Sequence, residues 1–207
     1  MRLHNVPGSE MTPTGSEVDV RIARGEKIAI RRILAGDLPP IAGFPFTVSI
    51  TEPLSDPDLL TKAFRSSGLW TNTAGAVAIV DAQNGRLLGT MQFYRSAPCI
   101  HGFELGYIIH DPADRGAGKA SEAVKLFSDY LFETLPDFYR LQLIIEAWNV
   151  PSWKLAERCG FVREGLLRSA GFGSGDPADC FIYCRTRKDW HEASHSPVSM
   201  GGVSNAT

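Results

Sequence analysis

The sequence predicts a mixed α/β fold with a mostly antiparallel sheet and one parallel β-α-β crossover. Two apolar or alternating runs, 74–81 and 86–94, are joined by a segment ending in Asn84-Gly85, which is typical of a β-hairpin. Later, an alternating run (102–109), a long amphipathic stretch and an apolar run (140–147) follow one another. Strand, helix and strand in succession require a right-handed crossover between parallel strands, while the hairpin makes the rest antiparallel.

Both ends of the 207-residue chain are predicted to be tails. Residues 1–17 are rich in Pro, Gly, Ser and Thr, and residues 192–207 contain few bulky apolar side chains. Such segments bury too little surface to offset the entropy of ordering. We expect one folded domain over residues 18–191.

Composition excludes several classes of protein. The chain has 21 Lys+Arg against 23 Asp+Glu, a formal net charge of -2, which argues against sequence-independent nucleic-acid binding. No apolar run approaches the ~18 residues that a membrane helix needs, and the polar N-terminus lacks the apolar core of a signal peptide. We therefore expect a soluble cytoplasmic protein with no nucleic-acid or membrane partner. Its cysteines lie in apolar stretches and are predicted to be reduced core thiols: Cys99, Cys159, Cys180 and Cys184.

The first half of the domain is predicted to begin with a strand over 26–33. A proline-rich irregular segment (36–53) follows, and a helix over 56–67 starts at Ser55-Asp56-Pro57. The hairpin described above comes next.

The second half carries the most regular periodicity. In the strand 102–109, the side chains of Phe103, Leu105, Tyr107 and Ile109 share one face, so Glu104 points to the other. An apolar stripe from Ala120 to Leu131 predicts an amphipathic helix that Pro136 ends. The remaining predicted elements are a strand over 140–147, a helix over 149–159 and strands over 161–168 and 180–186.

The loop between the alternating strand and the long helix, residues 111–120, is predicted to bind an anion. Its glycines and alanines leave backbone N–H groups uncovered at a helix N-terminus, which suits a pyrophosphate, although a plain strand-to-helix turn would look similar. A Walker loop would need Gly at 113 and Ser or Thr at 120, where Ala113 and Ala120 stand. A dinucleotide-binding loop would need Gly or Ala in place of Ser121 and a repeated parallel fold.

The pattern Arg115-x-x-Gly118-x-Ala120 resembles the signature of the GNAT acetyltransferase superfamily. Other stretches resemble its ribosomal-protein N-acetyltransferase (RimJ/RimL) branch: Glu104 to Pro112, Asn149-x-x-Ser152, Glu157 to Phe161, Gly165-x-x-Arg168 and Asp189-Trp190. The resemblance covers residues 26–190.

The resemblance implies that strands 102–109 and 140–147 splay apart and hold acetyl-CoA between them. Backbone groups of Gly116, Ala117, Gly118, Lys119 and Ala120 would hold the pyrophosphate, with charge from Arg115 and Lys119. Asn149 would bond the pantetheine arm, unless it only caps the helix. The backbone N–H groups of Tyr107, Ile108 and Ile109 would face the thioester carbonyl.

Acetyl transfer to an amine needs a base for the amine and an acid for the leaving thiolate. Many superfamily members carry a tyrosine as the acid, but that position is Ala156 here. The resemblance makes Ser152 the candidate acid, with a helix cap or a CoA contact as the alternative. Glu104 is the candidate base, and a solvated strand glutamate is its alternative. His110 and Glu146 are lesser candidates.

The acceptor is expected to enter over the 36–53 segment. Aromatic residues that would line its pocket, or instead form core, are Phe44, Phe46, Trp70, Phe93, Tyr94 and Phe172. The insert 171–177 is a candidate loop at its border. The sequence His191-Glu-Ala-Ser-His195 matches a zinc-protease pattern, but nothing downstream supplies a third histidine or continues an amphipathic helix, so no metal site is predicted.

Together these features predict an N-acetyltransferase that transfers acetyl from acetyl-CoA directly to a primary amine in a ternary complex. The expected acceptor is a protein or peptide N-terminus or a small amine such as an amino acid or antibiotic. Two alternatives remain: a transferase for a longer acyl-CoA, and a module that binds CoA without turnover. We expect a monomer or homodimer.

Overall fold

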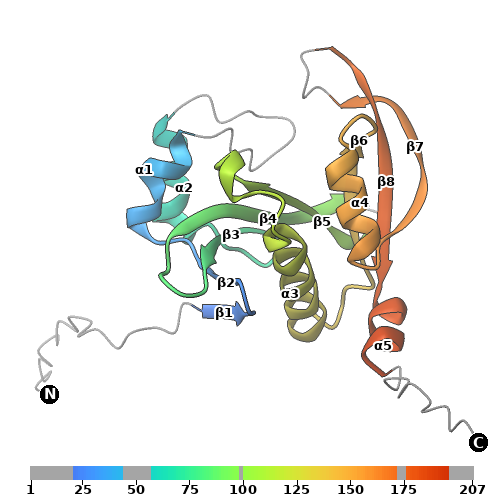
Figure 1. Cartoon of the computed structure of the whole chain (residues 1–207), viewed down its shortest axis with the longest axis horizontal. Coiled ribbons are helices and arrows are strands. Elements are labelled where there is room, and N and C mark those ends of the chain that lie inside the picture. The colour runs from blue at the N-terminus through green and yellow to red at the C-terminus, as the bar shows by residue number, and fades with distance from the viewer. Residues whose placement is uncertain (1–20, 44–56, 98–99, 172–175, 196–207) are drawn as a thin grey trace, which may run out of the picture.

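The computed structural model describes residues 21–43, 57–97, 100–171 and 176–195 of the chain (Figure 1). Its eight strands are β1 (Arg21–Arg24), β2 (Ile28–Arg32), β3 (Ala74–Asp81), β4 (Leu87–Ala97), β5 (Ile100–Ile109), β6 (Arg140–Glu146), β7 (Val162–Gly171) and β8 (Ala178–Thr186). They form one sheet in the order β1-β2-β3-β4-β5-β6-β8-β7. Only β5 and β6 pair in parallel; the other neighbours are antiparallel. The predicted fold class is confirmed.

The helices cover both faces of this sheet. They are α1 (Leu38–Ala42), α2 (Pro57–Ser67), α3 (Lys119–Thr134), α4 (Val150–Arg158) and α5 (Arg187–His195), with 3-10 turns at Ala35–Asp37 and Pro112–Asp114. The helices α3 and α4 share one hydrophobic cluster with the sheet, whereas α1 and α2 belong to a second cluster. In Figure 1, α1 and α2 lie at one end of the molecule, and β7, β8 and α5 lie at the other.

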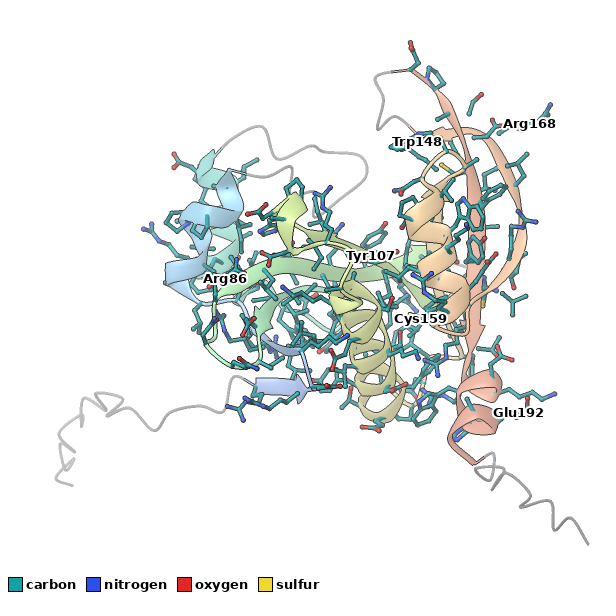
Figure 2. The ribbon with its side chains drawn as sticks, viewed as in Figure 1. Arg86, Tyr107, Trp148, Cys159, Arg168 and Glu192 are labelled. Carbon is teal, nitrogen blue, oxygen red and sulfur yellow. The ribbon has the colours of Figure 1, made fainter. Side chains whose placement is uncertain are left out.

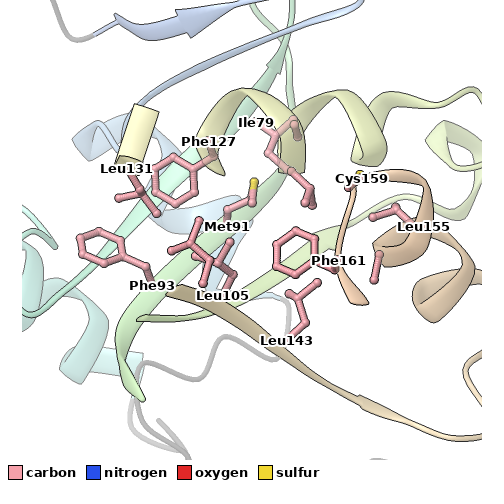
Figure 3. Packing of buried hydrophobic residues seen from close by; sticks show 14 of the residues in the cluster. Ile79, Met91, Phe93, Leu105, Phe127, Leu131, Leu143, Leu155, Cys159 and Phe161 are labelled. Carbon is pink, nitrogen blue, oxygen red and sulfur yellow. The ribbon is translucent and has the colours of Figure 1, made fainter. Parts of the chain in front are cut away.

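The larger cluster fixes α3 and α4 against the middle of the sheet (Figure 3). Phe127 and Leu131 of α3 and Leu155 of α4 are buried against strand residues such as Met91 and Leu143. Burial of a side chain of this size contributes about 1.5–3 kcal/mol. The cluster therefore holds the start of α3 at a defined place beside the end of β5.

The two central strands, β5 and β6, separate soon after they meet. They pair through Gly102↔Arg140, Phe103↔Leu141 and Glu104↔Gln142. The rest of each strand pairs only with its outer neighbour, β4 or β8. The predicted splay is confirmed, and we call the point where the strands part the fork.

The prediction missed one strand and two helices. Strand β1 has four residues, Arg-Ile-Ala-Arg, which are too few to show a period. Helix α1 lies in the segment predicted to be irregular, where Pro39 falls in its first turn.

Helix α5 was not predicted. It continues to His195, four residues into the predicted tail 192–207. A tertiary contact and a local cap account for it: Trp190 stacks on Phe132 at 5.5 Å, and Asp189 accepts hydrogen bonds from the backbone and side chain of Thr186, just before the helix. The predicted tail 1–17 lies outside the described residues, and the domain limits stay a prediction.

The zinc-protease-like segment therefore lies on a helix, contrary to the expectation. The ring of His191 lies 4.7 Å from that of Trp190. Within the described ranges, no group of three or more His, Cys, Asp or Glu side chains could hold a metal ion.

Three cysteines, Cys159, Cys180 and Cys184, are buried free thiols, as predicted. Cys99 lies outside the described residues. Among the helices that the structure describes, none is long and apolar enough to cross a bilayer.

Candidate functional site

A cavity of about 770 Å³ opens where the fork, the 111–118 loop and the two helices α3 and α4 meet. All but one of the predicted cofactor-binding residues line it: Tyr107, Ile108, Ile109, Arg115, Gly116, Gly118, Lys119, Ala120, Asn149 and Ser152. The exception is Ala117. Five further residues also line it: Asp114, Ser121, Pro151, Leu155 and Arg158. The end of β5, the loop, the start of α3 and the more distant helix α4 thus form one wall.

The loop presents bare backbone to this cavity. Gly116 has φ +85° and Gly118, the N-cap of α3, has φ +79°, a left-handed conformation that L side chains rarely adopt. A Cβ built on Gly116 would meet no atom within 4 Å, so the backbone there faces open space. The positive end of the α3 dipole lies at the same place. The loop, for which a plain strand-to-helix turn was the alternative interpretation, therefore borders a cavity.

A buried carboxylate braces the loop. Asp114 is 9% exposed, and it accepts two hydrogen bonds of 2.8 Å from Arg86 and one of 2.8 Å from Lys119. These bonds hold the pKa of Asp114 well below its usual range. Because Arg86 comes from the β3–β4 hairpin, the loop is tied to a segment 28 residues earlier in the chain.

The two cations that the resemblance assigned to the phosphates are thus engaged within the protein. Lys119 binds Asp114, while Arg115 donates to the carbonyl oxygens of Ile109 (3.0 Å) and His110 (3.3 Å). Both still line the cavity.

Two further cations at the site were not predicted. Arg158 lines the cavity from the last turn of α4. Lys27 donates from Nζ to the carbonyl of Ala117 at 3.0 Å. Arg158 falls within a stretch that carried the family resemblance, so its position was a usable signal. Lys27 reaches the loop from the β1–β2 turn, 90 residues away, and no local sequence pattern predicts this contact.

Side chains from both sides of the fork meet on the cavity side. The Tyr107 hydroxyl of β5 lies 2.7 Å from Ser152 Oγ of α4. Asn149 is the N-cap of α4, yet its side chain makes no capping hydrogen bond. The interpretation that the Asn149 side chain only caps the helix is therefore wrong. Asn149 lines the cavity. Burial raises the pKa of Tyr107 to about 12.

Glu104 lies on the opposite face of β5, at the fork itself. It is 6% exposed, and it accepts hydrogen bonds from Tyr94 Oη (2.5 Å) and Gln142 Nε2 (3.0 Å). Burial and the neighbouring carboxylate raise the pKa of Tyr94, so the phenol remains a donor. The alternative of a solvated strand glutamate is wrong. Gln142 Oε1 is buried without a hydrogen-bond partner among the described residues.

The lesser candidates for the base, His110 and Glu146, have different surroundings. His110 is buried, its Nε2 lies 3.3 Å from Thr90 Oγ1, and burial lowers its pKa. Glu146 is half-buried at the end of β6, beside Gly171. Ala156, at the position of the family tyrosine, is fully buried in the core.

The aromatic residues predicted to line the acceptor pocket differ in their surroundings. Phe93 is core, Trp70 carries the guanidinium of Arg32 at 3.6 Å, and Tyr94 binds Glu104. Phe44, Phe46 and Phe172 lie outside the described residues, as does part of the insert 171–177.

The cavity fits a cofactor that carries a diphosphate and a long polar arm. Bare backbone and a helix N-terminus suit the diphosphate, and Arg115, Lys119 and Arg158 add positive charge along the same wall. The open strand edges beyond the fork suit the amide groups of an extended arm.

Comparison with known families agrees with this geometry. Residues 28–162, more than half of the chain, match the acetyltransferase (GNAT) domain model. The chain belongs to this family. GNAT acetyltransferases use acetyl-CoA as the acetyl donor.

Curated relatives are N-acetyltransferases from bacilli. The chain is 32% identical over 91 residues to a probable N-acetyltransferase, YjcK, of Bacillus subtilis, covering 44% of this chain and 49% of that protein. It is 29% identical over 117 residues to the uncharacterized N-acetyltransferase p20 of Bacillus licheniformis, covering 56% and 65%. The chain thus spans about half to two thirds of the length of these relatives.

Solved structures share the fold. A spermidine/spermine N-acetyltransferase, SpeG, of Vibrio cholerae superimposes with a TM-score of 0.69 at 24% identity, over 82% of this chain and 98% of that one. A GNAT-family acetyltransferase of Bacillus anthracis gives a TM-score of 0.65 at 18% identity, over 80% and 98%.

Proposed function

We propose that the chain is an acetyl-CoA-dependent N-acetyltransferase that transfers acetyl directly to a primary amine. The observation that carries this proposal is the fork: the cavity lies on one side of it and a buried carboxylate lies on the other. Donor and acceptor can therefore approach one reaction point from opposite faces of the sheet.

On the cavity side, acetyl-CoA supplies an acetyl thioester, a carbonyl group that an amine can attack. Backbone N–H groups of Gly116 to Ala120 bind its diphosphate. Asn149 bonds the pantetheine arm. Backbone N–H groups near Tyr107 to Ile109 face the thioester carbonyl and stabilise the charge that develops on its oxygen. Ser152, which lines the cavity, donates to the leaving sulfur.

On the opposite face, Glu104 accepts the proton of the attacking amine, directly or through water. Its two hydrogen bonds hold the carboxylate at the fork. A buried carboxylate at the fork suits a cationic amine that must lose a proton before it attacks.

The acceptor that we propose is the α-amine of a protein or peptide, or a small amine. The stretches that resemble the RimJ/RimL branch favour the α-amine. The polyamine acceptors named for SpeG are included as small amines, since that protein shares the fold.

A thiol-release assay tests the function. We expect release of CoA from acetyl-CoA with at least one member of a panel of peptides, amino acids, aminoglycosides and polyamines. Propionyl-CoA and butyryl-CoA in the same assay test the donor chain. Measurable CoA binding without release for any acceptor would favour a binding module instead.

A further inference from the structure

Tyr107 and Ser152 make a contact across the fork that the roles above leave unused. The phenol belongs to β5 (Figure 2), and the serine belongs to α4, 45 residues later. Tyr107 Oη lies 2.7 Å from Ser152 Oγ and 3.3 Å from the carbonyl oxygen of Ser152. Both side chains line the cavity.

Either hydroxyl can be the donor in the shorter contact, and we assign the direction from acidity and distance. Each hydroxyl has one hydrogen to donate. The phenol is the stronger acid of the two, and 2.7 Å is the ordinary distance between two hydroxyl oxygens, whereas 3.3 Å to the carbonyl is long. With Tyr107 assigned as the donor to Ser152 Oγ, the hydroxyl hydrogen of Ser152 can be donated to a third atom, and the serine lines the cavity.

We propose that Tyr107 is a positioning residue that aims the hydroxyl hydrogen of Ser152 at the sulfur of the leaving thiol. This inference rests on the proposed acetyltransferase function. As the C–N bond forms, the C–S bond breaks and its electron pair stays on sulfur, while the amine proton passes to Glu104 or water. Ser152 donates a hydrogen bond to the charge on sulfur, and the released thiolate then takes a proton from water.

The surroundings of Tyr107 suit this role. Its high pKa, caused by burial, keeps the phenol protonated and donating at every pH at which an amine acetyltransferase would work. The position on α4 where many family members carry a tyrosine is a buried alanine, Ala156. The strand thus brings a phenol to the cavity that the helix does not provide.

Kinetics of a double-mutant cycle test the coupling. Removal of the serine hydroxyl in Ser152→Ala is expected to lower kcat about a hundredfold, and Tyr107→Phe about tenfold, with KM for acetyl-CoA within about twofold in each. Because Tyr107 acts through Ser152, the double variant should be no slower than Ser152→Ala. Tyr183→Phe, which removes a buried hydroxyl bound to Glu157 away from the cavity, is the matched control and should keep the wild-type rate.

A second measurement needs no turnover. The thiol of bound coenzyme A is titrated through the ultraviolet absorbance of its thiolate. Loss of a donor to the thiolate should move the midpoint upward by about one pH unit in Tyr107→Phe and in Ser152→Ala, and not in Tyr183→Phe. If Tyr107→Phe does not fold, Tyr107→Leu takes its place in both measurements.

The outcomes separate the two proposals. Effects of Tyr107→Phe and Ser152→Ala that multiply in the double variant, or an unmoved thiol titration in Tyr107→Phe, would overturn the positioning role alone. A wild-type protein that binds coenzyme A but turns over no acceptor would overturn the proposed function and, with it, the role in catalysis.

Discussion

The two sides of the fork are built in different ways. On the cavity side, the wall is made largely of residues that are consecutive in the chain, Ile108 to Ser121, and its key groups are backbone N–H groups of a helix start. On the other face, a single carboxylate, Glu104, is held by one side chain from each neighbouring strand. The first region binds by the shape of its backbone, and the second by side chains that strand register brings together.

This difference predicts which amino-acid substitutions each side tolerates. A backbone site depends on residue types that permit its conformation, so glycine and the bracing contacts matter most there. A side-chain site depends on single functional groups, so an isosteric substitution can abolish its chemistry without altering the fold. Substitutions in the 111–118 loop should thus change cofactor affinity, while substitution of Glu104 on the other face should change kcat.

The largest effect is expected from Glu104→Gln. The amide keeps the shape of the side chain but accepts no proton, so kcat should fall at least about a hundredfold while acetyl-CoA affinity changes less than about twofold. Steady-state kinetics and calorimetry measure the two. Glu164→Gln, which removes an exposed carboxylate bound to Arg140, is the control. An unaltered pH-rate profile in Glu104→Gln would remove this residue from the mechanism.

The next effect is expected from Gly118→Ala. A Cβ at φ +79° costs about 1–2 kcal/mol of stability and distorts the N-cap of α3, so coenzyme A should bind about tenfold more weakly. Gly85→Ala is matched in strain, at φ +73° in the β3–β4 hairpin. Thermal melts should show similar losses for both variants, and calorimetry a loss of affinity for Gly118→Ala alone. Equal affinities would show that the loop does not bind the cofactor.

A smaller effect is expected from Arg86→Ala. This substitution removes two of the three hydrogen bonds that side chains of Arg86 and Lys119 donate to Asp114. Without this brace the loop should become less ordered, and the Kd for coenzyme A should rise about threefold to fivefold with kcat unchanged. Lys62→Ala, on α2, is the control. A change in kcat without a change in Kd would contradict a purely bracing role.

The smallest effect is a pH dependence of stability from His110. Because burial lowers its pKa in the folded protein, the unfolded chain binds a proton more readily. The stability is fully present above the unfolded pKa, about 6.5, and declines as the pH falls below that value toward the folded pKa. Urea unfolding at pH 7.5 and 5.5 should therefore show a smaller pH difference in His110→Gln than in wild type. The exposed histidine His101 provides the control, His101→Gln.

The same contrast decides how much the sequence could predict. The cavity wall followed from local patterns, because Gly116, Gly118 and the amphipathic stripe of α3 are neighbours in the chain. Glu104 could be placed on the correct face of β5 from alternation alone. Its partners Tyr94 and Gln142 could not be found, since they depend on the register of β4 and β6. The contacts of Lys27 and Arg86 with the loop could not be predicted either, because each residue reaches the loop from a turn that is distant in sequence.

The fork gives the protein sheet edges in its interior. Edge strands normally lie at the rim of a sheet, where their unpaired N–H and C=O groups invite pairing with another chain. Beyond Glu104 and Gln142, the facing edges of β5 and β6 instead lie between two halves of one sheet, flanked by β4 and β8. These edges can form hydrogen bonds with a narrow extended molecule. A strand of another protein would have to enter between the two halves of the sheet. Such an internal edge separates recognition of a ligand from the hazard of aggregation.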